Sequence, residues 1–432
     1  MSAQPSAPDR PKPATEAIAG LTTFFTMAYI VVVNPAILAT EGTGMPFSGV
    51  LTATVVVCFV MTLLMGLYAR LPFAVAPGMG LNAFFAYTLV LGQGIPWPTA
   101  LGIVFWAGVV FLVISATPLR EMIARAIPRE LRAAAAAGIG LFLTFIGLQH
   151  AGFVTSHPVT MVTIGPLDHR AVLTVVAVLV TAVLLKRGNP LAFLAGIFTA
   201  TAAAWVMGWV DRPAALFSPP DFSLFLQFDP WGAISLALLP AIVALLFTDL
   251  FDSLSTFIGV SQASGLVDRD GQPIRLRQGL IVDALATLGA GLAGTSSGTA
   301  YIESIAGIRS GGRTGLTAVV TACMFLPCLF VAPLAASVPE FATAGVLILV
   351  GAAMFQPVVR VDFTSVEEGL PAFATIVLIP LTFSITQGIL WGFILHVLLY
   401  VVAGRRREVH PVMAVLAAAS IGLLLLEHSW RR

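Results

Sequence analysis

Four carboxylic acids lie deep within apolar stretches of this 432-residue sequence: Asp249, Asp252, Asp283 and Glu303. In the sequence, no Lys or Arg lies equally deep beside them. A charge at the centre of a lipid bilayer costs about 2.5–3.5 kcal/mol on insertion scales, so acids in such a setting usually serve a substrate or an ion. The alternative, which we favour for Asp283, is that a protonated acid hydrogen-bonds a broken helix end.

Two of these acids form a close pair. Asp249 and Asp252 are three residues apart, so on a helix they share one face, and Ser255 and Thr256 continue that face one turn on. Two nearby carboxylates in a medium of low dielectric constant resist ionising together. The pair therefore suits a group that takes up and releases a proton near neutral pH.

Two short Gly-rich segments carry further polar groups. The first, Ala76–Leu91, contains Asn82, whose amide can both donate and accept hydrogen bonds. The second, Gly294–Ile308, contains Glu303 and three polar neighbours: Thr299, Tyr301 and Ser304. Broken helices expose unpaired backbone N–H and C=O groups. Together these groups predict a site for a flat heterocycle that carries donors and acceptors.

The composition indicates which elements must position these residues. The chain is 58% hydrophobic and 10% charged, whereas soluble domains carry about 25% charged residues. A net charge of +1 gives no indication of a nucleic-acid partner. The three cysteines and six histidines show no metal-ligand spacing, so we expect neither a metal nor a cofactor.

The apolar residues fall in runs long enough to cross a bilayer, which takes about 20 residues for an α-helix. The predicted spans are 17–39, 48–69, 97–118, 134–151, 170–186, 190–210, 233–262, 278–294, 315–336, 341–357, 370–385 and 387–403. With the two Gly-rich segments these make about 14 membrane segments, so we predict an all-α polytopic membrane protein. A further apolar run, 412–426, either crosses the bilayer or lies on it.

The positions of the basic residues indicate the orientation. The Arg clusters at 309–313 and 405–407 fall in cytoplasmic loops only if both Gly-rich segments cross the membrane and the N-terminus is cytoplasmic. Each half then has an odd number of crossings, which predicts a 7+7 inverted repeat. The Gly-rich segments are third and tenth in order, and paired broken segments of this kind point to a binding site in transporters.

These inferences predict a domain organisation. A cytoplasmic tail, 1–16, precedes the first repeat, 17–210, and an outer loop, 211–232, precedes the second repeat, 233–403. A basic region with an extra apolar helix, 404–432, ends the chain.

Four motifs together resemble the AzgA-like branch of the nucleobase transporters, which carries adenine, guanine and hypoxanthine. They read TTFFTMAYIVVVNP, PGMGLNAFFAY, FTDLFDSLSTFIGV and GTSSGTAYIESIAGIRSGGRTGLTA. The resemblance runs from about Ala17 to His410. It implies a core domain of segments 17–118 and 233–336, a gate domain of segments 134–210 and 341–403, an elevator-like movement of core against gate, and a homodimer.

The resemblance also implies roles for individual residues. Related permeases place an acid of the eighth segment and an acid or amide of the tenth on the nucleobase. These correspond here to Asp252 and Glu303, and Asn82 falls where the third segment faces the ligand. Ser255 replaces a glycine that is usual in this branch, so the pocket differs in detail.

We therefore predict proton-coupled purine uptake through a multi-pass protein of the inner (plasma) membrane. The residues expected to bind substrate are Asn82, Asp252, Glu303, Thr299 and Ser304, and those expected to couple the proton are Asp252, Glu303 and Asp249. Thr295–Thr299 is the alternative location for a sodium ion. Other hypotheses are uracil, xanthine or an anion on the same fold, a channel, and a membrane enzyme, although no nucleophile–base pair supports an enzyme.

Overall fold

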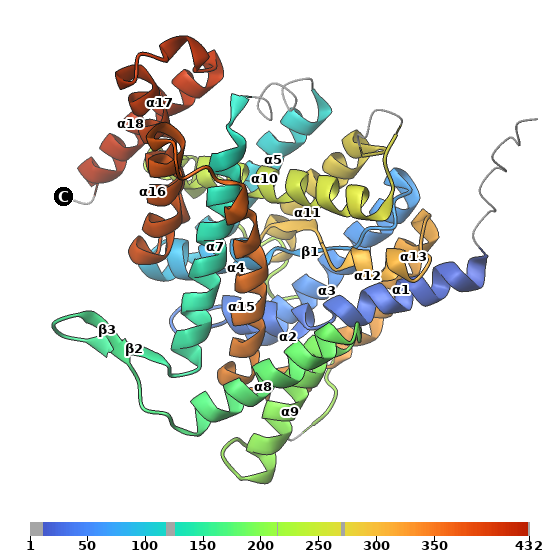
Figure 1. Ribbon diagram of the computed structural model, residues 1–432. Helices are drawn as coiled ribbons and strands as arrows, with labels where there is room; N and C mark the ends of the chain where they lie inside the picture. Colours follow the sequence, from blue (N-terminus) through green and yellow to red (C-terminus); the bar gives the residue numbers. More distant parts are fainter. Residues whose placement is uncertain (1–11, 118–125, 214, 269–272, 431–432) are drawn as a thin grey trace, which may run out of the picture.

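The computed structural model describes residues 12–117, 126–213, 215–268 and 273–430, the last five of them without side chains. The first eleven residues of the predicted tail lie outside these ranges. The described chain is mostly helical, and its helices gather into one bundle (Figure 1). The predicted helical class is therefore confirmed.

Helices of the N-terminal half coincide with the predicted spans. They are α1 (Pro13–Met27), α2 (Ile30–Leu38), α3 (Phe47–Leu64), α4 (Met79–Ala83), α5 (Trp97–Ala116), α7 (Arg129–His150), α8 (His169–Lys186) and α9 (Ala192–Val206). Two of them continue as π-helix, α3 through Met65–Ala69 and α4 through Phe84–Gly92. Sequence signals fix several starts: Pro13 lies at the first turn of α1, and Asp168 accepts hydrogen bonds from two N–H groups of α8.

The C-terminal half follows the same correspondence. Its helices are α10 (Leu239–Ser264), α11 (Leu276–Ala293), α12 (Ser304–Arg309), α13 (Gly315–Phe325), α14 (Ala332–Ala336), α15 (Glu340–Phe355), α16 (Val366–Thr382), α17 (Ile385–Val402) and α18 (Pro411–Trp430). Short 3-10 turns lie at Gly232–Ile234, Leu326–Phe330, Gln356–Arg360 and Arg406–Glu408. The run predicted at 412–426 is helical, as α18.

Among the described residues, eight helical stretches are long and apolar enough to cross a membrane. The first, Pro13–Leu38, combines α1 and α2, which we predicted as one continuous span. In the structure the helix is interrupted at Ala28 and Tyr29, and Pro35 lies within α2. The chain is a multi-pass membrane protein, as its composition indicated.

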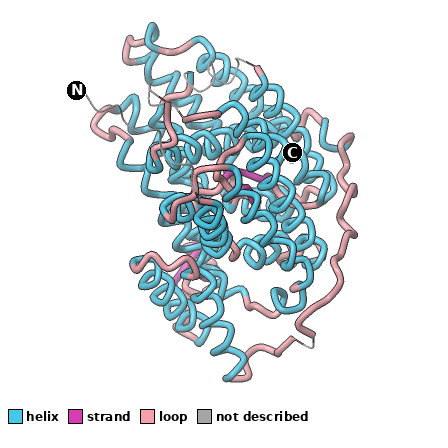
Figure 2. Tube along the Cα trace, turned by 90° about the vertical axis from the view of Figure 1, so that its right-hand side faces the viewer, coloured by secondary structure: helices cyan, strands magenta, loops and turns pink. Residues whose placement is uncertain are grey.

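Two small antiparallel strand pairs add to the helices. β1 (Val75–Pro77) pairs with β4 (Gly298–Ala300), and β2 (Val154–His157) pairs with β3 (Met161–Ile164). The β2–β3 hairpin projects from the bundle, whereas β1 and β4 lie inside it, surrounded by helices (Figure 2). Extended backbone can lie at that depth because the two strands satisfy each other's N–H and C=O groups.

Small residues let the helices approach closely. α5 packs against α11, and α7 packs against α15 and α16. A Cβ atom at Gly108 of α5 would lie 2.4 Å from the backbone nitrogen of Leu288, and one at Gly140 of α7 would lie 2.5 Å from the carbonyl oxygen of Gly351. Such contacts are typical of helix packing in membranes, where close backbone approach replaces the hydrophobic effect as the driving force.

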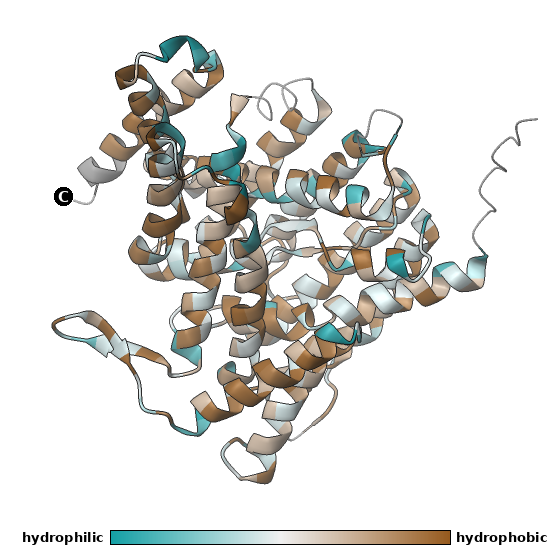
Figure 3. Cartoon of the chain, in the orientation of Figure 1, coloured by the Kyte–Doolittle hydropathy of each residue, from teal (hydrophilic) through white to brown (hydrophobic). Residues whose placement is uncertain are grey.

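Apolar side chains face outward as well as inward. Along α8, Val172, Leu179 and Val183 are all more than half exposed, and apolar residues cover the visible side of this helix (Figure 3). An outward apolar surface of this kind fits contact with lipid or with another apolar surface.

The loop that joins the two halves is anchored to the bundle. The hydroxyl of Ser48, at the start of α3, donates to Oδ2 of Asp221 over 2.6 Å. This hydrogen bond lowers the pKa of Asp221 below its usual value. The loop is therefore tied to the N-terminus of α3.

Candidate functional site

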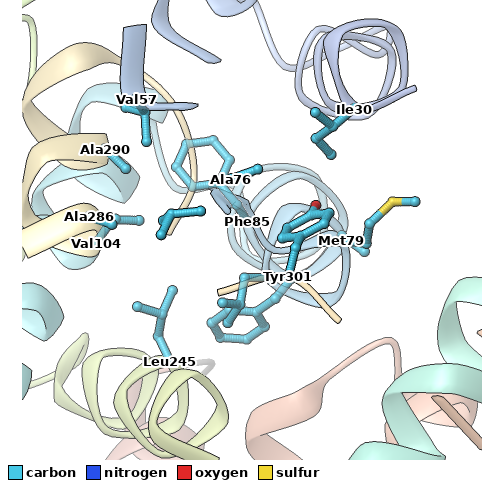
Figure 4. Packing of buried hydrophobic residues seen from close by; sticks show 14 of the residues in the cluster. Ile30, Val57, Ala76, Met79, Phe85, Val104, Leu245, Ala286, Ala290 and Tyr301 are labelled. Atoms are coloured by element: carbon cyan, nitrogen blue, oxygen red, sulfur yellow. The ribbon is translucent and has the colours of Figure 1, made fainter. Parts of the chain in front are cut away.

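The two Gly-rich segments meet at the centre of the bundle. β1 belongs to the first and β4 to the second, and their register pairs Val75 with Ala300 and Pro77 with Gly298. Each strand is followed by a short helix, α4 after β1 and α12 after β4. Buried side chains pack around this strand pair, among them Phe85, Met79 and Tyr301 (Figure 4). The structure thus brings together the two segments that the sequence singled out as broken.

Asn82 lies in α4 and is fully buried. Its Oδ1 accepts a hydrogen bond from the hydroxyl of Ser296, which comes from the other Gly-rich segment. Its Nδ2 has no hydrogen-bond partner among the described residues. A buried amide donor without a partner costs free energy, so Asn82 has donor capacity that a ligand would satisfy.

Glu303 lies between β4 and α12. Its Oε1 accepts a hydrogen bond of 2.5 Å from the hydroxyl of Tyr29, at the interruption between α1 and α2. The Tyr29 ring packs against Phe193 of α9, with 4.7 Å between the ring centroids. Glu303 is only partly buried, so its carboxylate is oriented by Tyr29 yet remains accessible.

The residues beside Glu303 are tied to the first Gly-rich segment. The hydroxyl of Ser304 accepts from the backbone N–H of Ala74 at 3.0 Å. The hydroxyl of Tyr301 donates to the carbonyl oxygen of Pro77 at 2.5 Å. These bonds hold the two crossing segments in a fixed relation, and Ser304 contributes to them directly.

Asp249 is buried in a network of hydroxyls. Its Oδ2 accepts from Thr287 of α11 at 2.5 Å and from Ser297 at 2.7 Å. Its Oδ1 has no partner within the described part of the chain. The carboxylate therefore bonds α10 to α11 and to the second Gly-rich segment.

Asp283 of α11 has a similar environment. Its Oδ2 accepts from the hydroxyl of Thr299 at 3.3 Å, and that hydroxyl lies 3.2 Å from the hydroxyl of Ser253. Asp283 is fully buried and lies close enough to Asp249 for their charges to interact. Thr299, which we predicted to bind substrate, is turned toward this buried acid.

Asp252 is in a different environment from Asp249. It is partly exposed and lines a cavity of about 40 Å³ between α10, α4, α7 and α15. No hydrogen bond between described residues includes its carboxylate. A separation of three residues turns the second side chain about 60° around the helix axis. Asp249 therefore points toward α11, where it bonds to Thr287, and Asp252 points toward the cavity.

The predicted substrate residues thus fall in two groups. Asn82, Glu303, Thr299 and Ser304 lie at the strand crossing, and Asp252 lies on α10 at the cavity. The charges of Asp252 and Glu303 are close enough to interact. Among the described residues, no group of three or more His, Cys, Asp or Glu is arranged to hold a metal ion.

Two polar residues of this region were missed by the sequence analysis. Tyr29 lies within the first quoted motif, yet nothing in its spacing indicated a partner in the second half. Arg132 lies just before the predicted span 134–151, but in the structure it belongs to the first turn of α7 and lines the same cavity as Asp252. A basic residue therefore lines the same cavity as one of the deep acids.

Helices interrupted inside the bundle, with acids and an amide gathered at the interruption, define a membrane transporter. The chain belongs to the permease family Xan_ur_permease, whose sequence model matches residues 14–391. The prediction of a transporter, and not an enzyme, is confirmed, as is the resemblance to AzgA-like purine permeases.

Individual relatives match along nearly their whole length. The chain is 40% identical to the adenine permease AdeP of Escherichia coli, over 93% of this chain and 91% of that protein. It is 41% identical to the guanine/hypoxanthine permease PbuO of Bacillus subtilis, over 93% and 95%. Its fold is similar to the transmembrane domain of a cyanobacterium bicarbonate transporter, BicA, with a TM-score of 0.63, 18% identity, and coverage of 88% and 97%.

Proposed function

We propose that this protein takes up the purine nucleobases adenine, guanine and hypoxanthine. The observation that carries this proposal is near-full-length similarity to permeases named for adenine and for guanine and hypoxanthine. The chemistry at the strand crossing agrees with such a cargo. An amide with an unsatisfied donor and an accessible carboxylate suit a flat, uncharged ring that carries both acceptors and donors.

Asn82 and Glu303 are the proposed direct contacts to the purine. Asn82 offers its Nδ2 hydrogens, and Glu303 offers an oxygen not used by Tyr29. Thr299 and Ser304 act close by, since both have hydroxyls at the strand crossing. Asp252 of α10 lines the cavity together with Gly80 and Leu81 of α4, the helix that carries Asn82.

Proton coupling is the proposed source of energy. A neutral purine gains nothing from the membrane potential, so accumulation requires a co-transported ion. Asp252, Glu303 and Asp249 are the carboxylates to which we assign proton exchange: Asp252 lines the cavity, Glu303 lies at the strand crossing, and Asp249 bonds to Ser297 of the second Gly-rich segment. Because Asp252 and Glu303 interact, we assign the proton to this pair. Asp252 is the proposed member that exchanges it, since its carboxylate forms no hydrogen bond with another described residue.

An elevator-type movement is proposed for the transport cycle. Core segments 17–118 and 233–336 include both strands of the crossing, and gate segments 134–210 and 341–403 include most of α7 and of α15. The cavity at Asp252 lies where these two sets of helices meet. A core that slides against the gate would carry the site across the membrane. The proposed 7+7 inverted repeat of 14 segments is supported by the pairing of β1 with β4, because each strand lies in the corresponding broken segment of its half.

Assembly and location complete the proposal. The exposed apolar side of α8, within the gate, supports contact with lipid or with a second copy in a homodimer. We place the protein in the inner (plasma) membrane with a cytoplasmic N-terminus, a cytoplasmic tail at 1–16, an outer loop at 211–232 and a basic C-terminal region at 404–432.

Counterflow in proteoliposomes tests the function. Vesicles that contain purified protein and excess unlabelled hypoxanthine should accumulate radiolabelled hypoxanthine, adenine or guanine transiently. Uracil, xanthine and bicarbonate serve as competing cargoes in parallel vesicles. Exchange of one of these three with no exchange of any of the labelled purines would contradict the proposal.

A further inference from the structure

Arg132 is placed to take part in substrate recognition. It lies one turn into α7, and its side chain lines the same cavity as Asp252 and Ser255 of α10 and Gly80 of α4. A cationic group at the start of α7, most of which belongs to the proposed gate, therefore lines the same cavity as a carboxylate of the proposed core.

The guanidinium of Arg132 has unused donor capacity. Its Nε is buried and has no hydrogen-bond partner among the described residues. None of the ion pairs formed between described residues includes Arg132, so it shares the cavity with Asp252 without pairing with it. A buried donor of this strength is costly unless an acceptor reaches it, so the arrangement favours a ligand that supplies acceptors.

Purines differ in the acceptors that they offer to such a group. In guanine and hypoxanthine the adjacent O6 and N7 atoms are both acceptors, and a guanidinium binds this pair with two parallel hydrogen bonds. Adenine carries an amino donor beside N7. A guanidinium in the same position would place one of its N–H donors against this amino group and keep only the hydrogen bond to N7. The guanidinium carries no acceptor that could compensate.

We propose that Arg132 makes this permease selective for 6-oxopurines over adenine by donating to O6 and N7, an inference that rests on the proposed purine transport. Asp252 accepts from N1–H on the neighbouring edge of the same ring. Arg132 and Asp252 line the cavity between α7 and α10, so the ring would lie between these two helices.

Equilibrium binding of radiolabelled hypoxanthine and adenine to the purified full-length protein tests this inference. The variants are Arg132→Gln and Arg132→Lys, and the matched control is Arg129→Gln, an exposed arginine in the same turn of α7. Wild type should prefer hypoxanthine. Arg132→Gln should weaken hypoxanthine binding roughly tenfold to a hundredfold and adenine binding less than about threefold. Arg132→Lys keeps the charge but cannot donate two parallel hydrogen bonds, so its hypoxanthine affinity should lie between those of wild type and Arg132→Gln.

Each outcome decides between distinct conclusions. A hypoxanthine-to-adenine ratio that is unchanged in both Arg132 variants, or a wild type that prefers adenine, overturns the selectivity role and leaves purine transport intact. If the wild type binds neither purine, the proposed function itself fails. If Arg132→Gln does not fold, the hypoxanthine-to-adenine affinity ratio of Arg132→Lys tests the proposal. The melting temperature of Arg132→Lys, compared with that of Arg129→Gln, shows whether this variant is folded.

Discussion

The hydroxyl of Tyr29 donates a 2.5 Å hydrogen bond to Oε1 of Glu303, a residue 274 positions further along the chain. This bond joins the interruption between α1 and α2 to the start of α12. It fixes the carboxylate that we propose as a direct contact to the purine, and it couples the first helix of the protein to the second Gly-rich segment.

Tyr29→Phe removes this donor and keeps the ring against Phe193. Loss of a hydrogen bond to a charged group costs roughly 1.5–3 kcal/mol, so the melting temperature should fall and purine affinity should weaken several-fold. Thermal unfolding and radioligand binding measure the two effects. Tyr68→Phe is the control, since Tyr68 is half exposed and should change neither. Unchanged purine affinity in Tyr29→Phe would show that the orientation of Glu303 is unimportant.

Asn82→Ala should weaken purine binding while membrane insertion stays intact. Loss of one hydrogen bond to a buried partner costs about 1–3 kcal/mol, and binding assays on the purified protein measure this loss. Asn34 is the matched buried amide, because its Nδ2 already donates to Thr54 and Thr295. Asn34→Ala should lower thermal stability with little change in affinity. Equal purine affinity in Asn82→Ala and wild type would reduce Asn82 to a structural role.

Asp252→Asn tests the coupling ion. The variant should still bind purine, because the amide keeps the shape of the side chain and its oxygen can still accept from the N1–H of the ring. Binding should depend less on pH, because the amide cannot exchange a proton. It should fail to concentrate purine when an inward proton gradient is imposed on proteoliposomes, whereas wild type should succeed. Asp229→Asn, in the outer loop, is the control. Wild-type uptake that follows a sodium gradient and ignores a pH gradient would refute proton coupling.

Gly80→Ala tests whether close contact between α4 and α7 matters for transport. A Cβ atom at Gly80 would lie 2.5 Å from Cγ2 of Ile139, so either this side chain or one of the two helices must shift. Such overpacking typically costs about 1–3 kcal/mol, and initial uptake rates should fall. Adding Ile139→Ala should restore part of the rate. Gly259→Ala, where a Cβ meets nothing within 4 Å, is the control. A normal uptake rate in Gly80→Ala would indicate that this contact does not limit movement.

Glu16 offers a prediction about stability alone. It is 1% exposed in the first turn of α1, and its carboxylate accepts from the N–H groups of Arg313 and Thr314 and from the hydroxyl of Thr317. Glu16→Gln removes the charge at the N-terminus of α13 and should lower the unfolding free energy by roughly 1–3 kcal/mol. Thermal unfolding measures this effect, with the exposed Glu41→Gln as control. Equal melting temperatures for the two variants would contradict it.

The sequence by itself determined the class of protein, most helix positions and the two broken segments. These features depend on local properties: apolar runs long enough to cross a bilayer, and Gly-rich breaks such as those at 76–91 and 294–308. It also identified the deep acids, because a charge in apolar sequence is visible without any knowledge of its neighbours.

Only the tertiary structure decided which groups meet. The spacing of Asp249 and Asp252 predicted one shared face, yet packing of α11 against α10 buries Asp249 among hydroxyls and leaves Asp252 at the cavity. Tyr29 and Arg132 gained their roles through contacts between residues far apart in the chain. Hydropathy and periodicity report the environment along a single helix, whereas these contacts depend on how separate helices are placed and rotated against one another.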